Sequence, residues 1–219
     1  MTLRSNQREP KQSRFTLPND IWSYKLPPPA FSILTYLRYL DCHHRGTPPD
    51  AGQLAKHLRM SEKMAKTQMA TLLSRGLVTR DMRPRITDEY KKFFSLPNEL
   101  FALGLGHGAV TVYAYLLYCE DRRTHQCHPS YKTISASTGL AVNTVMKHIG
   151  KLEDRQLISV EHTSYLDNNG MKWNSNNRYT ILPICQAVDR FYQCQLAELN
   201  LATEHQRIAS LLSAGESPA

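Results

Sequence analysis

Hydrophobic positions between Pro129 and Ile158 fall at helical spacing in two short runs. The first run ends at Gly139, which can take the left-handed conformation that closes a helix, and Leu140 would then fill the space between two helices. In the second run, apolar residues recur every three or four positions and form one stripe. They are Val145, Ile149 and Leu152. The pattern predicts a helix, a tight turn and a second helix.

Polar and cationic residues occupy the other side of the second predicted helix. They are Asn143, Thr144, Lys147, His148 and Lys151. A helix that lies in the major groove of DNA needs such an outward row. Asn143 could pair with adenine and Lys147 with guanine, although the same side chains would also suit a solvated surface. A plain helical hairpin with a charged face is therefore the alternative interpretation.

Two strand-like segments follow the predicted helices. They cover residues 157–166 and 171–181, with a turn at 167–170 between them. Lys172 lies at the start of the second segment and is a further candidate DNA contact. A helix, a turn, a helix and a hairpin together predict a winged helix. The expected fold class is mainly α with small β wings.

Several short motifs carry a resemblance to a known family. They are His128-Pro129-Ser130, Ile134, Thr138-Gly139-Leu140, Asn143-Thr144-Val145, Leu152-Glu153 and Leu157-Ile158. The segment from about residue 93 to 182 resembles the winged helix-turn-helix modules of bacterial regulators and of plasmid and phage replication initiators. The resemblance implies DNA binding, and in such initiators one of two winged helices reads the repeated origin sequence while the other mediates dimerisation. One departure is Ala141, where these modules usually have Ser, Thr or Asp to cap the second helix.

The chain also matches itself at a period of about eighty residues, which indicates a duplicated domain. Residues 15–20 read FTLPND, and residues 94–99 read FSLPNE. Later matches pair Ala30 with Ala109, Tyr36 with Tyr115, Leu72 with Leu152 and Arg75 with Arg155. We therefore expect two tandem winged-helix domains. The expected segments are a basic disordered arm at 1–14, winged-helix domain 1 at 15–92, winged-helix domain 2 at 93–185, and a C-terminal helix with a frayed tail at 186–219.

The first copy has its own candidate DNA-binding residues. Its second helix would begin after Ser61, a good N-cap residue. The outward residues of that helix would be Lys63, Lys66, Thr67 and Gln68. The place of the wing holds three arginines around Pro84, namely Arg80, Arg83 and Arg85. A proline in this position predicts a short or distorted hairpin.

The distribution of charge adds an anionic partner to this picture. The chain has a net charge of +8, and its pI is near 9.3. Residues 15–92 hold 13 Lys and Arg against 7 Asp and Glu, whereas residues 93–186 hold 8 against 7. If double-stranded DNA is the partner, attraction to phosphate should come chiefly from the first half. The second copy is then better suited to reading bases. It also stays open whether the first copy reads bases or only phosphate.

Composition and the N-terminal sequence restrict the other classes of function. The arm at 1–14 is basic and lacks an apolar run, so it predicts neither a signal peptide nor an anchor. It is either a disordered tail or an arm along the minor groove. No segment has the apolar length that crossing a bilayer needs. We expect a soluble cytoplasmic protein that has no membrane partner and no small-molecule substrate.

Cysteine and histidine residues raise the questions of a metal site and of catalysis. The five cysteines include no CxxC pair, which favours reduced thiols. One cluster could offer zinc ligands, namely Cys119, His125, Cys127 and His128, but its spacing is not that of a familiar zinc finger. The histidine spacing needed by nicking enzymes is absent, as are paired carboxylates and an HExxH motif. We expect no cofactor and no enzymatic activity.

The last predicted element is a helix from about Gln186 to Ser213. Its apolar stripe includes Val188, Tyr192, Leu196 and Leu199. The stripe fades and then resumes at Ile208. It could pack back on the second copy, or it could bind a partner helix in a homodimer. A homodimer through domain 1 is the other possibility that the resemblance suggests.

These patterns together predict a protein that binds double-stranded DNA in a sequence-specific manner. The favoured role is a transcriptional regulator. One alternative is a replication initiator of a plasmid, phage or conjugative element. The other is a protein-interaction module whose outward helices contact a partner protein. The DNA sequence that is read and the oligomeric state are not determined by these patterns.

Overall fold

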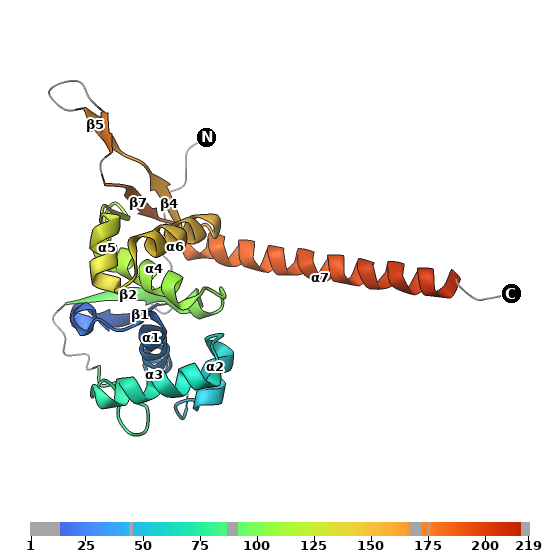
Figure 1. The fold of residues 1–219 in the computed structure, drawn as a ribbon, viewed down its shortest axis with the longest axis horizontal. Coiled ribbons are helices and arrows are strands. Elements are labelled where there is room, and N and C mark those ends of the chain that lie inside the picture. Colours follow the sequence, from blue (N-terminus) through green and yellow to red (C-terminus); the bar gives the residue numbers. More distant parts are fainter. Residues whose placement is uncertain (1–13, 44–45, 87–91, 167–171, 175, 216–219) are drawn as a thin grey trace.

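The computed structural model describes residues 14–43, 46–86, 92–166, 172–174 and 176–215. The chain is mainly helical with small antiparallel sheets, which confirms the predicted fold class. Two helical units lie on either side of a central two-stranded sheet, and one long helix projects from the second unit (Figure 1).

The second unit has the order of elements that a winged helix needs. Its helices are α4 (His107–Cys119), α5 (Tyr131–Thr138) and α6 (Val142–Asp154). Its strands are β3 (Gln126–Cys127), β4 (Ile158–Glu161), β5 (Ser164–Leu166), β6 (Lys172–Asn174) and β7 (Arg178–Ile181). The first sheet has the order β3-β7-β4, and β5 pairs with β6 at the tip. Each predicted wing strand is thus divided in two, and the predicted turn at 167–170 lies outside the described residues.

The turn between α5 and α6 has the predicted geometry. Gly139 has a φ of +71°, and its amide donates to the carbonyl of Ser135 over 2.9 Å. Leu140 is half-buried between the helices, and its carbonyl accepts from the Ser135 hydroxyl over 2.6 Å. The predicted stripe of Val145, Ile149 and Leu152 is buried, which confirms the register of α6.

The first unit is a smaller version of the same arrangement. Its helices are α1 (Pro28–Cys42), α2 (Ala51–His57) and α3 (Glu62–Ser74). The Ser61 hydroxyl accepts from the Met64 amide over 3.2 Å, so the predicted cap of α3 is present. In place of a wing there is a tight turn closed by a single β-bridge between Val78 and Pro84. This short hairpin is what the proline predicts, because proline has no amide hydrogen with which to extend a ladder.

The two units are joined by strands β1 (Arg14–Pro18) and β2 (Phe93–Pro97), which pair antiparallel. The central pair of residues is Thr16 opposite Ser95, and these two positions correspond in the internal repeat. On either side of this pair, Phe15 lies opposite Leu96 and Leu17 lies opposite Phe94, so the phenylalanine of each strand faces the leucine of the other. The pairing is therefore symmetric under exchange of the units. It gives the chain a local two-fold axis through the centre of the ribbon.

Other corresponding residues make the same contacts in both units. Arg75 donates to the carbonyl of Tyr24 over 2.9 Å, and Arg155 donates to the carbonyl of Leu103 over 3.3 Å. Tyr24 is the last residue of the short 3-10 helix η2 (Asn19–Tyr24), and Leu103 follows the short 3-10 helix η3 (Asn98–Phe101). Each arginine thus links the C-terminal end of the second helix in the helix-turn-helix to the segment that precedes the first helix of the same unit.

A shared core joins the units. The Trp22 ring of the first unit stacks on Phe31 at 5.1 Å and on Phe94 at 6.0 Å, and it meets Tyr115 edge-on at 5.0 Å. Because Phe94 and Tyr115 belong to the second unit, one side chain packs in both. Helices α1 and α4 also pack against each other. The buried apolar residues of the two units form one continuous cluster.

Helix α7 (Ile184–Gly215) leaves this core after its first two turns (Figure 1). Ile184 and Ala187 are buried, Val188 and Phe191 are half-buried, and Arg155 lies over the Phe191 ring at 5.7 Å. Beyond Phe191, every described side chain of the helix is exposed. Packing back on the second unit therefore holds only for the start of α7.

A substitution at Ala141 tests the account of the α6 N-terminus. Ala141 precedes α6 in an extended conformation and makes no side-chain cap, whereas Ser61 caps α3 in the same place. Ala141→Ser is expected to raise the free energy of unfolding by about 1 kcal/mol, because its hydroxyl would accept from an amide in the first turn of the helix. Urea denaturation measures the change, and Ala141→Val serves as a control without a cap. A serine variant no more stable than the valine variant would contradict this account.

Candidate nucleic-acid interface

The outer face of α6 presents most of the side chains that the sequence predicts there. Asn143, Lys147 and Lys151 are exposed, and Thr144 is half-buried. Met146 lies among them with 48% of its surface exposed. It was not among the DNA contacts predicted from the sequence. No described atom lies within 4 Å of the place that a side chain on Gly150 would take, so this face of the helix is open.

His148 does not lie on the exposed face, and the prediction of its orientation was wrong. Its ring turns toward α4, where a Cβ on Gly108 would come within 2.1 Å of its Nε2. Its Nδ1 is buried without a hydrogen-bond partner. The position flanks the apolar stripe of α6, and the missing side chain at Gly108 gives the ring room to turn inward. Burial, and to a lesser degree the charge of Lys151, lowers the pKa of His148, so the ring is neutral at pH 7.

A groove of about 480 Å³ separates the start of α5 from the base of the wing. Its lining residues come from the N-terminal ends of α5 and α6 and from the segments that flank the wing tip. They are Ser130, Tyr131, Lys132, Val142, His162, Thr163, Asn176, Asn177 and Tyr179. Lys132 and His162 are exposed there, and they add two basic side chains beside the predicted face of α6.

Asn177 holds the base of the wing against α5. Its amide nitrogen donates to the hydroxyl of Tyr131 over 2.7 Å and to the hydroxyl of Tyr179 over 3.4 Å. Its amide oxygen lies 3.0 Å from Nδ1 of His162, across the two chains of the wing. Burial raises the pKa of Tyr179, so its hydroxyl stays protonated. Sequence reasoning missed this network, because its members are up to 46 residues apart and only the fold brings them together.

The wing itself contains Lys172, which pairs through the backbone with Leu166 in the β5–β6 hairpin. This hairpin projects away from the body of the second unit (Figure 1). At its base, Arg178 and Glu161 form an ion pair across β4 and β7.

The predicted residues of α3 are less uniform than those of α6. Lys63 is exposed, and so is Thr67, whose hydroxyl donates to the Lys63 carbonyl over 2.9 Å. Lys66 pairs with Glu62 over 2.6 Å, and this hydrogen bond raises the pKa of Lys66. Gln68 is half-buried, and its side-chain oxygen is buried without a partner. Lys63, Lys66 and Thr67 are therefore exposed, whereas Gln68 is not.

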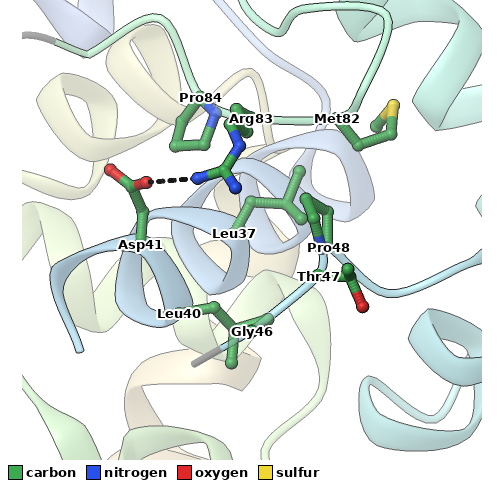
Figure 2. A pocket seen from close by; sticks show the side chains of 9 residues that line it. All are labelled: Leu37, Leu40, Asp41, Gly46, Thr47, Pro48, Met82, Arg83 and Pro84. Atoms are coloured by element: carbon green, nitrogen blue, oxygen red, sulfur yellow. Dashed lines mark ion pairs between the residues drawn. The ribbon is translucent and has the colours of Figure 1, made fainter. Parts of the chain in front are cut away.

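The three arginines of the first unit lie together on the tight turn, but they do not form a projecting wing. Arg83 points across a small pocket toward Asp41 of α1, with 3.9 Å between its Nη1 and the carboxylate (Figure 2). Arg38 approaches the same carboxylate to 3.3 Å. This contact draws the turn back against α1, while Arg80 and Arg85 are exposed.

The structure does not bring the two sets of predicted residues into one patch. Helices α3 and α6 lie on opposite sides of the layer made by α1, the β1–β2 ribbon and α4 (Figure 1). Each unit therefore presents its own surface to a ligand.

Two of the four candidate zinc ligands lie in surroundings that do not suit a metal site. His125 Nδ1 lies 2.6 Å from a carboxylate oxygen of Glu120. Burial raises the pKa of the Cys127 thiol to about 12, and a protonated thiol is a poor ligand. Among the described residues, no three His, Cys, Asp or Glu side chains are placed to hold a metal ion. Within the same part of the chain, no helix is both long enough and apolar enough to cross a membrane.

One protein-family model matches the helix-turn-helix part of the second unit. Residues 103–158, which include α4, α5 and α6, match the family model of the helix-turn-helix domain. A solved structure described as a possible transcriptional regulator from Methanosarcina mazei Go1 is 19% identical and covers 54% of this chain and 94% of that chain, with a TM-score of 0.34. The search of the curated proteins gave no match.

Removal of the Asn177 side chain tests the junction between wing and body. Asn177→Ala is expected to lower the free energy of unfolding by about 1–2 kcal/mol, because it leaves two tyrosine hydroxyls and His162 without their partner. Urea denaturation measures the loss. Asn176→Ala is the matched control, since only the main-chain carbonyl of Asn176 accepts from Thr163. Equal stability of the two variants would show that the network contributes nothing.

The inward orientation of His148 predicts a dependence of stability on pH. Burial lowers the pKa of both His148 and His107 below the ordinary value of 6.5, so the unfolded chain binds protons more readily than the folded one. The free energy of unfolding should therefore fall as the pH drops from 7 to 5. His148→Gln should reduce this fall, as measured by denaturation at each pH. An unchanged slope would contradict the assigned orientation.

Proposed function

Because residues 103–158 match a helix-turn-helix domain and the second unit has the element order of a winged helix, we propose that the chain is a DNA-binding transcriptional regulator that recognises specific sequences in double-stranded DNA. One observation carries this proposal. An open helix face with Asn143, Lys147 and Lys151 lies next to a groove with basic side chains and a projecting β hairpin. A helix of this kind fits the major groove while a wing reaches the neighbouring backbone.

Base recognition is assigned to α6. Asn143 has the amide that pairs with adenine, and Lys147 has the ammonium that meets guanine in the major groove. Met146 lies between them in sequence and is 48% exposed, so it could contact the methyl group of thymine. Thr144 at the edge of the same face suits a contact with the sugar-phosphate backbone.

Phosphate contacts are assigned to the groove and to the wing. Lys132 and His162 face the open side of the groove from α5 and from the wing base. Because Asn177 bonds both to Tyr131 of α5 and to His162, the two basic side chains are held at a set separation. Such contacts fix the position of the protein on the duplex, and Lys172 would extend them along the wing.

The first unit is proposed to contribute electrostatic affinity. It holds most of the excess positive charge, and Lys63, Arg80 and Arg85 are exposed on it. Its surface lies on the far side of the ribbon from α6, so its contacts would be made with a separate stretch of DNA. Each engaged cation releases a counterion, which makes the affinity fall as salt rises.

A replication initiator is the second candidate role, and the pairing of two helix-turn-helix units in one chain favours it. A regulator and an initiator differ in where they bind. Mapping of bound sites on the genome separates them, because an initiator occupies repeated sequences at an origin and a regulator occupies promoters. A protein-interaction module is the third candidate, and it predicts no sequence-dependent affinity for duplex DNA.

We also propose the chemistry, the cellular location and the oligomeric state of the protein. The chain is proposed to bind DNA without catalysis and without a cofactor. The proposed location is the cytoplasm, where thiols such as that of Cys185 stay reduced. The DNA-bound form is proposed to be a homodimer, which would place four helix-turn-helix units in one assembly.

Substitutions on α6 test base reading against simple attraction. Asn143→Ala and Lys147→Ala are each expected to reduce the preference for the selected site over random DNA by about 1–3 kcal/mol, with a smaller effect on non-specific affinity. Sites are first selected from random duplexes, and affinities are then measured by fluorescence anisotropy at several salt concentrations.

Lys63→Ala is the matched control on α3. It should weaken binding to all sequences equally and reduce the slope of log affinity against log salt by about 1. A uniform loss for the α6 variants as well would show that α6 meets only phosphate. Absence of any sequence preference in the natural chain would overturn the proposal.

A further inference from the structure

Helix α7 exposes apolar side chains along its whole described free length. It has 32 residues and is therefore about 48 Å long. The large exposed residues, with the fraction of surface that solvent reaches, are Tyr192 at 57%, Leu196 at 60%, Leu199 at 65%, Leu201 at 61% and Ile208 at 47%. Scattered exposed leucines are ordinary, but five on one projecting rod form an apolar surface that needs a partner.

These side chains lie on two opposite faces. With about 100° between successive residues of a helix, Tyr192, Leu196 and Leu199 fall within one narrow arc. Leu201 and Ile208 fall on the other side, about 180° away. We call these the proximal stripe and the distal stripe. One partner helix can cover only one of two opposite faces, and the proximal stripe holds three of the five side chains.

The free part of α7 also lacks the local interactions that stabilise an isolated helix. Among its described residues the one ion pair is between Arg207 and Glu204, which are exposed and 3.8 Å apart. Such a pair adds little to helix stability in water. Isolated helices are marginal unless an apolar face is packed. A contact along the stripes is therefore what would keep this segment helical.

A second copy of the chain fits these stripes best. The segment from 192 to 215 contains Glu198, Glu204 and Arg207, so it is almost neutral, and two such helices would not repel each other. A strongly charged partner would have nothing to pair with on it. Two helices of this length would bury on the order of 1,000 Å² in total, near the lower end of specific interfaces.

The alternative dimer surface is already used within the chain. In a homodimer through domain 1, the edge strand β1 and helix α1 would be the natural contacts. Here β1 pairs with β2, and α1 packs against α4 of the same chain. The internal pairing thus occupies these contacts of the first unit, whereas α7 has an uncovered apolar face.

We propose that α7 is a self-association helix that packs along its proximal stripe against α7 of a second copy. The inference deepens the proposed function, since it assigns the surface of the proposed homodimer. Because α7 points away from both units, the helix-turn-helix surfaces stay free in the assembly.

Sedimentation of the full chain tests the proposal. The natural protein should associate as its concentration rises from about 1 to 100 µM, a range typical of small interfaces. The double variant Leu196→Glu with Leu199→Glu should raise the dissociation constant at least tenfold, whereas Leu201→Glu with Ile208→Glu, on the opposite face, should associate as the natural chain does. Gln193→Glu with Asn200→Glu is the matched control, because it adds equal charge to exposed positions outside both stripes. This control should associate as the natural chain does.

Circular dichroism provides a second readout. The helical signal per chain should rise with concentration in the natural protein and stay constant in the variant of the proximal stripe, while thermal melting of the body is unchanged. A natural chain that stays monomeric at 100 µM would overturn the proposal, and so would a proximal-stripe variant that associates normally or a control that does not. A monomeric stripe variant that still binds DNA in a sequence-specific manner would agree with the proposed function. Failure of self-association and failure of DNA recognition can therefore be told apart.

Discussion

The antiparallel pairing of β1 with β2 is the constraint on which the rest of the structure depends. A two-stranded ribbon is only marginally stable alone, so it persists here because α1 and α4 pack beside it and against each other. The Trp22 ring extends this packing from one unit into the other. As a result, the two helix-turn-helix elements have a defined relation, and neither unit has a core that is separate from its neighbour.

Within this symmetric frame the two units have diverged in the parts that would face DNA. The second unit keeps a hairpin, with Asn177 holding the base of that hairpin against α5. The first unit replaces it with a turn that the contact between Arg83 and Asp41 draws back onto α1. The first unit also holds most of the excess charge. Divergence of this kind suits a division between reading of bases and attraction to phosphate.

Local signals predicted much of the fold. Gly139 closes α5, Ser61 caps α3, and the Val145 stripe sets the register of α6, because each depends on neighbours within a few residues. The orientation of His148 could not be predicted, since it depends on the absence of a side chain at Gly108 on another helix. The groove beside the wing was also missed, because its hydrogen bonds join residues that are distant in sequence. Whether α7 packs on the second unit or projects from it could not be predicted either. It depends on which surfaces the rest of the chain leaves uncovered, and the periodicity of apolar residues does not show that.

The register of the central ribbon has a consequence for how such a chain can arise. Thr16 and Ser95 correspond to each other in the two halves, so each strand pairs with its counterpart at the position that would pair with itself. A polypeptide with only one half could therefore join an identical polypeptide through the same ribbon, with serine opposite serine. Fusion of two tandem genes would convert that assembly of identical subunits into a single molecule. Once joined, the halves could accumulate different substitutions without losing their common axis.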